Sequence, residues 1–379
     1  MIENNHTSGN LSKMIRFYST ILWRNIHRGK LPYKAHLILS WKCQSRCVMC
    51  DIWKRKPGNE FTLEEWQKFF KRNPFLKWLT FTGGEPFLRD DLVEIVEAAA
   101  HHCTNLYLIN TPTNALSPDK ILKKVEGILK LGIPKYVLSI SLDGPPEVHD
   151  RVRGIPGTWE SAMEVLQGAK EIQKSHPEKF NVVLEYTLLP ESHGRFAEMV
   201  DALRKYAPEI NAGDFFLATP NISEHYYGNT HLSESLRSKK CRPLIESSLP
   251  QIQKVRQVNG KVEPGYIIPQ LFIDMAASYL RTDIPLMRCR ATRSTIFIDP
   301  EGTVYPCNGW NKVLGHLREA DFSLRKILEG PAITEIRQDM DQFKCGGCWT
   351  PCEAFVSIAE EVIRPKTILR LLGVLSRRR

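Results

Sequence analysis

Three closely spaced cysteines are the first residues in the chain that could do chemistry. Cys43, Cys47 and Cys50 form a CxxxCxxC pattern. Three thiolates at this spacing can hold three irons of a [4Fe–4S] cluster and leave the fourth iron open to a small chelating molecule. A structural zinc ion, which would need a fourth ligand such as His36, and a coincidence of three thiols are the alternative interpretations.

A second group of cysteines lies near the end of the chain, and its members are Cys289, Cys307, Cys345, Cys348 and Cys352. The segment between the first two has a turn-rich centre, 299–302, flanked by apolar runs at 295–298 and 303–305, which predicts a β-hairpin. A hairpin with a cysteine on each flank and a downstream CxxC can bring four thiolates together. The spacing does not distinguish an iron–sulfur cluster from zinc. We expect Cys103 and Cys241, which are isolated, to be buried apolar side chains.

A glycine-rich turn with one acidic residue, Gly83-Gly84-Glu85-Pro86, follows an apolar run at 78–82. Glycines permit close approach of the backbone, and a carboxylate next to a cation is favourable. By itself this motif would be read as a turn.

The elements that must position these motifs are repeated βα units. Apolar runs predict six strands, at 35–40, 78–82, 105–110, 136–142, 181–188 and 214–217. Helix starts fall between them, with a capping box at Thr62 and Glu65, a proline at the first helical position after Ser117, and a start at Thr158. In a parallel βα barrel the loops after the strands build the active site, and the first cysteine group follows the first strand.

Composition limits the class of protein. The 379 residues are 42% apolar and 25% charged, which disfavours a disordered or fibrous chain, and no apolar run reaches the roughly 18 to 20 residues that span a bilayer. The net charge of +10 favours acidic partners. The start of the chain does not resemble a secretory signal, so we expect a reducing cytoplasm, where clustered cysteines are metal ligands rather than disulfides.

The CxxxCxxC pattern followed one βα unit later by the GGEP motif resembles the radical S-adenosylmethionine (SAM) enzymes. The resemblance implies an α/β fold, a partial (β/α)6 TIM-type barrel followed by a small α+β auxiliary-cluster domain. In that family the three cysteines hold a [4Fe–4S] cluster whose open iron chelates the amino and carboxylate groups of SAM. Reductive cleavage of SAM then gives a 5′-deoxyadenosyl radical, which abstracts hydrogen from an unactivated carbon of the substrate.

The same resemblance implies further SAM contacts. Gly83, Gly84, Glu85 and Pro86 would hold the methionine ammonium. Met49, before the third cysteine, would lie near the adenine, where the family commonly has an aromatic residue. Ser141, Asp143 and Arg153 are candidates for the ribose or carboxylate, with turn and capping roles as the alternative for Asp143 and Arg153.

The late cysteines resemble the SPASM domain or its shortened form, twitch. Cys289, Cys307, Cys345 and Cys348 match the twitch arrangement, and Cys352 would be a spare thiol or would replace one of them. Five cysteines fit one auxiliary [4Fe–4S] cluster better than two, and such a cluster would aid electron transfer. A zinc ribbon is the alternative.

Both ends of the chain have basic amphipathic stretches. The first has apolar residues at helical spacing, namely Leu11, Met14, Ile15, Tyr18, Leu22 and Ile26, and Phe17 and Trp23 broaden its apolar side. The second has Ile368, Leu369, Leu372 and Leu375, followed by Arg377, Arg378 and Arg379. Either the two helices pack on the barrel or on each other, or they lie on an anionic membrane.

These observations predict five regions, an extension (1–34), the barrel (35–240), a helical linker (241–288), the cluster domain (289–360) and a basic helix (361–379). The expected function is that of a radical SAM oxidoreductase with a flavodoxin or ferredoxin as electron donor, acting on a lipid or lipid-linked molecule at the inner membrane face. One alternative is a SPASM-type maturase of ribosomal peptides, which has less support because no peptide-recognition domain is seen before the barrel. The other is a non-catalytic metal protein that binds RNA, although we expect no nucleic-acid partner.

Overall fold

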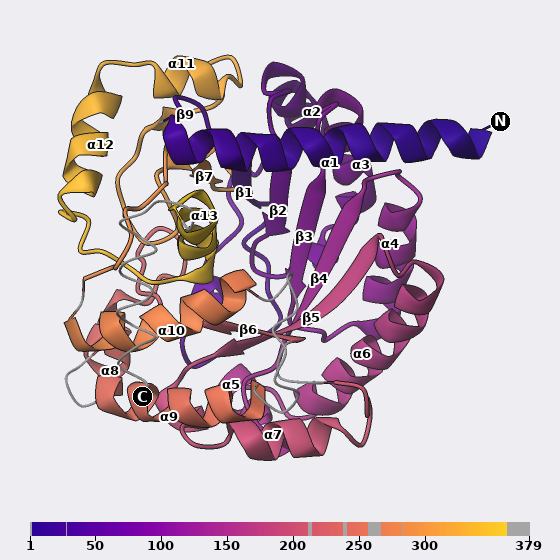
Figure 1. Ribbon diagram of the computed structural model, residues 1–379, viewed down its shortest axis with the longest axis vertical. Coiled ribbons are helices and arrows are strands. Elements are labelled where there is room, and N and C mark those ends of the chain that lie inside the picture. Colours follow the sequence, from indigo (N-terminus) through magenta and orange to yellow (C-terminus); the bar gives the residue numbers. More distant parts are fainter. Residues whose placement is uncertain are drawn as a thin grey trace.

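A single nine-stranded sheet organises the molecule (Figure 1). The computed structural model describes residues 2–27, 29–210, 214–237, 241–256, 267–282 and 284–361. The strand order is β6-β5-β4-β3-β2-β1-β7-β8-β9. The first six strands pair in parallel, each with its neighbour in the sequence, and they are β1 (Lys34–Ile38), β2 (Trp78–Thr82), β3 (Leu108–Thr113), β4 (Lys135–Ser141), β5 (Phe180–Thr187) and β6 (Phe215–Ala218).

Six helices follow these strands, and they are α2 (Leu63–Arg72), α3 (Leu92–His102), α4 (Pro118–Leu129), α5 (Pro146–Arg153), α6 (Thr158–Ser175) and α7 (Phe196–Leu203). All of them except α5, which lies against the cysteine loop, cover the outer face of the sheet (Figure 1). The predicted capping box is present, since the Thr62 hydroxyl accepts from Glu65 N and the Glu65 carboxylate accepts from Thr62 N. The βα barrel expected from the alternation of apolar runs and helix-periodic segments is confirmed.

Strand alternation separates the core from the cavity. On β1, Ala35 and Leu37 pack into the main hydrophobic core, whereas Lys34 and His36 line an internal cavity. Successive side chains point to opposite faces of a strand, so each strand contributes one side to the helices and the other to the barrel interior.

The third strand differs from the prediction by three residues. It runs from Leu108 to Thr113 rather than over 105–110. Leu106 and Tyr107 are buried in the connection before the strand, while Asn110 and Pro112 face the cavity. The inward residues at the end of this strand are polar or proline, as in a loop. The sequence pattern therefore ends the strand three residues too early.

The predicted hairpin of the late region is confirmed and continues the barrel sheet. β7 (Thr295–Ile298) pairs antiparallel with β8 (Thr303–Tyr305), and β9 (Gly315–His316) follows. β7 also pairs in parallel with β1, which joins the late region to the barrel without a break. The helices after the hairpin are α11 (Leu324–Leu328), α12 (Ala332–Asp341) and α13 (Pro351–Glu361).

The first helix, α1 (Ile2–Ile26), lies across the end of the barrel where the strands begin (Figure 1). Phe17 stacks on Tyr107 at a centroid distance of 4.9 Å and packs with Tyr33 and with Val356 of α13. The helices between barrel and hairpin are α8 (Ser233–Arg237), α9 (Cys241–Arg256) and α10 (Ile267–Thr282). The basic helix predicted for 361–379 lies, apart from its first residue, outside the described residues, as does the Cys241 side chain.

Candidate active site

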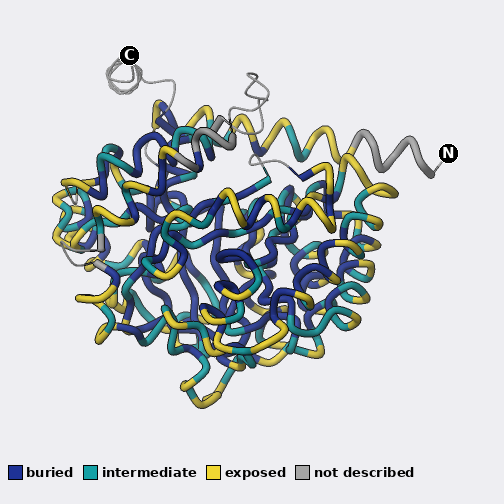
Figure 2. The backbone as a smooth tube through the Cα atoms, turned by 90° about the horizontal axis from the view of Figure 1, so that it is seen from below, coloured by how far each residue is buried: buried dark blue, intermediate teal, exposed yellow. Residues whose placement is uncertain are grey.

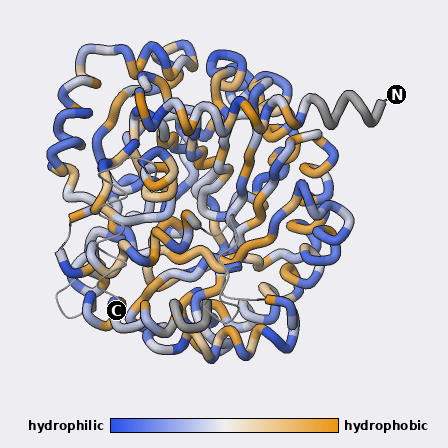
Figure 3. The backbone as a smooth tube through the Cα atoms, viewed as in Figure 1, coloured by the Kyte–Doolittle hydropathy of each residue, from blue (hydrophilic) through white to orange (hydrophobic). Residues whose placement is uncertain are grey.

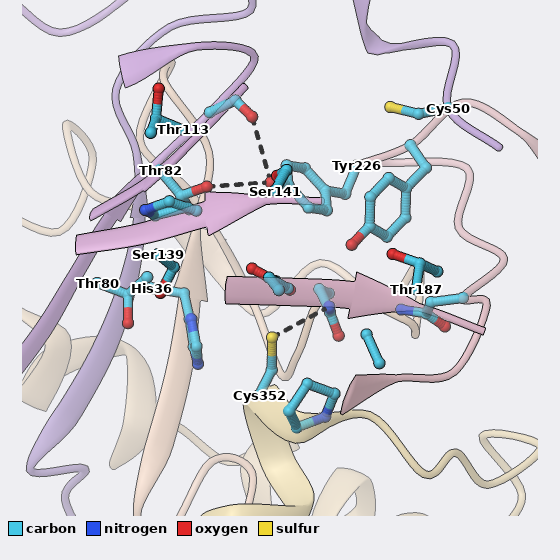
Figure 4. A pocket seen from close by; sticks show the side chains of 18 of the residues that line it. His36, Cys50, Thr80, Thr82, Thr113, Ser139, Ser141, Thr187, Tyr226 and Cys352 are labelled. Atoms are coloured by element: carbon cyan, nitrogen blue, oxygen red, sulfur yellow. Dashed lines mark hydrogen bonds between the residues drawn. The ribbon is translucent and has the colours of Figure 1, made fainter. Parts of the chain in front are cut away.

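A cavity of about 400 Å³ runs through the barrel interior (Figure 4). Its wall includes the inward side chains of all six parallel strands, among them His36, Thr80, Asn110, Ser139, Thr187 and Ala218. The cysteine loop after β1 lines it at the carboxyl ends of the strands, and α13 lines it through Cys352 and Phe355. Figure 4 shows strand side chains, from His36 of β1 to Thr187 of β5, together with Cys50 and Cys352 around this cavity. The cavity therefore extends from the first cysteine group to Cys352, whereas the other late cysteines do not line it.

The thiols of Cys43, Cys47 and Cys50 all line this cavity. The loop is held against α5, because Arg46 N donates to Arg153 O (2.9 Å) and Val48 N donates to Val152 O (2.9 Å). Burial raises the pKa of the Cys43 thiol to about 11, and the neighbouring Cys47 adds to the shift. Burial and Cys47 also raise the pKa of Cys50. Thiols that disfavour each other's ionisation lie close together, and a cationic iron–sulfur cluster bound to them would stabilise all three thiolates.

The GGEP turn runs directly against the cysteine loop. Gly84 N donates to Ser40 O (2.9 Å) and Glu85 N donates to Lys42 O (2.8 Å). A Cβ on Gly84 would lie 2.3 Å from Lys42 O and 2.8 Å from the Cβ of Cys43, so only glycine permits this approach. Pro86 starts the short 3-10 helix η2 (Pro86–Leu88).

Glu85 is a fully buried carboxylate at the cavity wall. It accepts hydrogen bonds from Asn114 N (2.7 Å), the Thr113 hydroxyl (3.0 Å) and Phe87 N (3.2 Å). Burial nevertheless raises its pKa to about 7. A carboxylate in this environment would be stabilised by a bound cation such as an ammonium group.

The candidates at the end of β4 also meet at this site. Asp143 forms an ion pair with Arg153 (2.5 Å) and accepts a hydrogen bond from Thr187 N (2.8 Å). The other terminal nitrogen of Arg153 lies 3.7 Å from Cys47 Sγ. Ser141, Met49 and Arg153 all line the cavity. Except for Pro86 and Asp143, every expected SAM-contact residue therefore lines this cavity. Pro86 follows Glu85 in the chain, and Asp143 contacts the cavity-lining Arg153.

The late cysteines divide between two environments. Cys289 and Cys307 flank the hairpin and pack with Ile336 and Met340 of α12. Burial raises the pKa of both thiols well above the usual range, and the Cys348 thiolate contributes to each shift. Cys348 therefore lies with this pair, and Cys345 is half-buried in the turn that precedes it.

Cys352 differs from these thiols because it lines the barrel cavity. Asn308 Nδ2 lies 3.7 Å from its Sγ, and burial raises its pKa to about 12. His36, considered as a zinc ligand, hydrogen-bonds the backbone of Cys352. Among the described side chains no three Cys, His, Asp or Glu residues converge on a point where one metal ion could bind. A [4Fe–4S] cluster needs a wider arrangement, since each cysteine binds a different iron. The isolated Cys103 is fully buried, as predicted.

Three residues at this site were not singled out in the sequence. Asn114 follows β3, and its side chain contacts both Cys43 Sγ (3.6 Å) and Gln44. Asn114 directly follows a strand, as the cysteine loop and the GGEP turn do, and this position in the sequence could have identified it. Tyr226 donates to Gly83 O (3.2 Å) from the segment between β6 and α8, and Glu185 lines the cavity from within β5. Nothing in the local sequence distinguishes the last two.

Comparison with known proteins agrees with this geometry. Residues 37–203 match the model of the radical SAM superfamily, and residues 289–349 match the SPASM iron–sulfur cluster-binding domain. The chain is 24% identical over 334 residues to an AdoMet-dependent heme synthase of Methanosarcina barkeri, covering 83% of this chain and 88% of that protein. It is 24% identical over 340 residues to a PqqA peptide cyclase of Granulibacter bethesdensis, covering 84% and 82%.

Among solved structures, Streptococcus suis SuiB bound to the precursor peptide SuiA is similar in fold. The TM-score is 0.56 at 16% sequence identity, covering 85% of this chain and 70% of SuiB. The expected fold and cofactors are confirmed by these matches. The chain is therefore an enzyme with a radical SAM domain at residues 37–203, which binds a [4Fe–4S] cluster and SAM, and a SPASM domain at residues 289–349, which binds an auxiliary iron–sulfur cluster.

Proposed function

We propose that this enzyme uses SAM to modify a peptide, by abstracting hydrogen from an unactivated carbon. The observation that carries the proposal is the continuous cavity between Cys50 and Cys352, which offers space for one residue of a substrate between the first cysteine group and Cys352. PqqA cyclase and SuiB, two of the similar proteins, act on or bind peptides according to their names. This interpretation replaces the lipid substrate expected from the sequence.

We assign the cofactor contacts to the residues that line the part of the cavity next to the cysteine loop, or that contact those residues. Cys43, Cys47 and Cys50 would hold the cluster, and Glu85 would bind the methionine ammonium. When bound, SAM supplies the hydrogen-abstracting radical. Gly83 and Gly84 permit the close approach of the backbone, and Arg153 offers a cation to the carboxylate or ribose region together with Ser141. Met49 would pack against the adenine.

The part of the cavity next to Cys352 suits a substrate side chain that has both apolar and polar atoms. Its wall is largely apolar, with Phe216, Phe355 and Trp78, and it also contains the Glu185 carboxylate and the Lys34 ammonium. Lys34 Nζ lies 4.0 Å from the Trp78 ring centroid and donates to Cys352 O (2.8 Å). Both groups can bind the polar backbone of a peptide, or accept and return a proton. Cys289, Cys307, Cys345 and Cys348 would hold the auxiliary cluster that accepts an electron, with Cys352 facing the substrate.

Deuterium transfer would identify the class of substrate. Cells of the source organism are grown in D₂O, and peptide, lipid and tetrapyrrole fractions are each incubated anaerobically with the reconstituted enzyme, SAM and reductant. We expect deuterium in 5′-deoxyadenosine only with the peptide fraction, and loss of the label after protease treatment of that fraction. A Cys50→Ala enzyme is the matched control. Deuterium from the lipid or tetrapyrrole fraction alone would overturn the peptide assignment.

The remaining partners are proposals as well. A flavodoxin or ferredoxin is the proposed electron donor. Contact with an anionic membrane, expected from the basic ends of the chain, is proposed for α1. Among the described residues no helix is long and apolar enough to cross a bilayer.

A further inference from the structure

The outward face of α1 is an apolar stripe that is largely uncovered in the described structure. Six large hydrophobic side chains of this helix are between 51% and 76% exposed, namely Leu11, Ile15, Tyr18, Leu22, Trp23 and Ile26. The other exposed large hydrophobic side chains of the described residues are scattered singly over the molecule. Figure 2 shows exposed positions recurring along α1, and Figure 3 shows hydrophobic positions along the same helix. A concentrated exposed apolar surface indicates an interaction site.

Packing of α1 on the barrel uses mainly another side of the helix, and of the stripe only the half-exposed Tyr18 has a ring contact with the barrel, to Tyr107 at a centroid distance of 6.0 Å. Phe17 is buried against Tyr33 and Tyr107, and Met14 and Ile21 pack beside it. Arg24, also buried, donates to Arg293 O (2.8 Å) and fixes the end of the helix. The apolar side predicted as a single broad face is therefore two faces, one that attaches the helix and one that remains free for a partner.

The sequence of α1 and of the residues directly after it is basic. Between Glu3 and Asp51 the chain has no acidic residue, and Lys13, Arg16, Arg24, Arg28 and Lys30 fall within or directly after the helix. Arg16 and Lys30 are exposed. The last described helix, α13, ends beside α1, where Asn25 Nδ2 lies 3.5 Å from Ala359 O. The sequence after Glu361 continues with six Lys or Arg residues and no acidic residue.

We propose that the stripe of α1 lies in the surface of an anionic membrane. An amphipathic helix with aromatic and aliphatic residues on one face and basic residues near it inserts at the boundary of headgroups and acyl chains. Each basic residue near an anionic leaflet adds to the electrostatic attraction between the protein and the membrane. Trp23 and Tyr18 are the residue types that favour the headgroup level.

The same charges disfavour a second copy of this chain as the occupant. Two stripes packed together would bring two acid-free basic segments into contact, and like charges oppose such pairing. The same repulsion between like charges disfavours the basic segment after Glu361 as the occupant of the stripe. An anionic lipid surface supplies the missing negative charge without any acidic residue in the protein.

This attachment would direct the active site away from the bilayer. α1 packs on Tyr33 and Tyr107, at the amino ends of β1 and β3, whereas the cysteine loop follows the carboxyl end of β1. The membrane face and the cysteine loop are therefore at opposite ends of the barrel. A substrate would enter from the aqueous side, and membrane binding would locate the enzyme rather than deliver a lipid to it.

Vesicle binding of the full-length reconstituted enzyme tests the proposal. With vesicles of phosphatidylglycerol and phosphatidylcholine we expect binding at low salt that weakens at high salt, because the Debye length falls from about 10 Å at 0.1 M to about 3 Å at 1 M. Pure phosphatidylcholine should bind less. The double variant Ile15→Gln and Leu22→Gln should bind about tenfold more weakly, equivalent to about 1.4 kcal/mol. The matched control changes two exposed hydrophobic residues elsewhere, Ile284→Gln and Val313→Gln, and should bind as the wild type does.

A charge exchange at one exposed position keeps the test independent of apolar packing. Ser19 lies on the outward face of α1. Ser19→Glu should weaken binding to the anionic vesicles, and Ser19→Lys should strengthen it. Iron content and thermal melting, measured for every variant, establish that each is folded.

Two results would overturn the proposal. Equal binding of the wild type and the stripe variant to anionic vesicles would exclude the stripe as the membrane contact. Loss of self-association in the stripe variant, measured by light scattering, together with no vesicle binding by the wild type, would identify a second copy as the partner. Neither result depends on the substrate, so the test is separate from that of the peptide assignment.

Discussion

Arg153 and Asp143 form an ion pair with 2.5 Å between Nη2 and Oδ2, and both side chains are less than 10% exposed. Arg153 ends α5 and Asp143 follows β4, so the pair ties the helix to the strand. The backbone carbonyl of Arg153 also accepts a hydrogen bond from Arg46 N of the cysteine loop. The buried ion pair thus positions Arg153, and the backbone of Arg153 in turn holds the loop that carries Cys43, Cys47 and Cys50.

Removing one partner of this pair should destabilise the protein strongly. In Asp143→Asn the Arg153 guanidinium remains buried without its counter-charge, and we expect the free energy of unfolding to fall by about 3–5 kcal/mol. Asp201→Asn, which breaks the exposed Arg204–Asp201 pair, should cost less than about 1 kcal/mol. Urea denaturation under anaerobic conditions measures both. Similar values for the two variants would show that Arg153 finds another partner or water.

The affinity for SAM should depend on pH through Glu85. Because burial raises the pKa of this carboxyl to about 7, the free protein must release a proton below that pH before it can bind the methionine ammonium as a carboxylate. Affinity should rise as the pH increases to about 7, and fall again above about 8 as the amino group of SAM loses its own proton.

Calorimetric titration of SAM between about pH 5.5 and about pH 9, a range that extends at least roughly one unit beyond both pKa values, gives the profile. Glu85→Gln should bind weakly and lose the acidic limb. Glu94→Gln, an exposed change on α3, should reproduce the wild-type profile. An acidic limb that persists in Glu85→Gln would assign the titration to another group.

Each cysteine of the first group should be required for cleavage of SAM. Replacing Cys43, Cys47 or Cys50 with Ala removes a proposed ligand of the SAM-binding cluster, so reductive formation of 5′-deoxyadenosine should stop. Cys103→Ala is the matched control, because Cys103 is buried at the C-terminal end of α3 and does not line the cavity. Undiminished 5′-deoxyadenosine from any of the three variants would remove that residue from the ligand set.

Iron counting should separate the two clusters. The reconstituted wild type should hold about eight irons, from roughly four per cluster, and the Cys43/Cys47/Cys50 triple variant about half of that. Cys348→Ser should also lose about half, because Cys348 lies with Cys289 and Cys307. Cys352→Ser should keep all of the iron, because Cys352 faces the barrel cavity. Loss of iron in Cys352→Ser would instead make this thiol a ligand of the auxiliary cluster.

The sequence determined the parts of this protein that depend on local patterns. Strand β2 was predicted to the residue, and the hairpin at 295–305 was recognised from a turn-rich centre between two apolar runs. The cysteine loop and the GGEP turn were found because their chemistry needs particular residue types a few positions apart. Glycine at position 84 is one such requirement, since any side chain there would collide with Lys42.

Only the tertiary structure decided which distant residues meet. Pairing of β7 with β1 brings residues 295–298 beside 34–37, and this joins the late region to the barrel sheet. The position of Cys352 on the cavity wall follows from the docking of α13, which a spacing of four residues from Cys348 does not specify. Likewise, α1 is amphipathic in the sequence, but packing of Phe17 selected which apolar side is buried and which is left to face outward. Periodicity identifies a face, whereas contacts between segments far apart in the chain determine what that face touches.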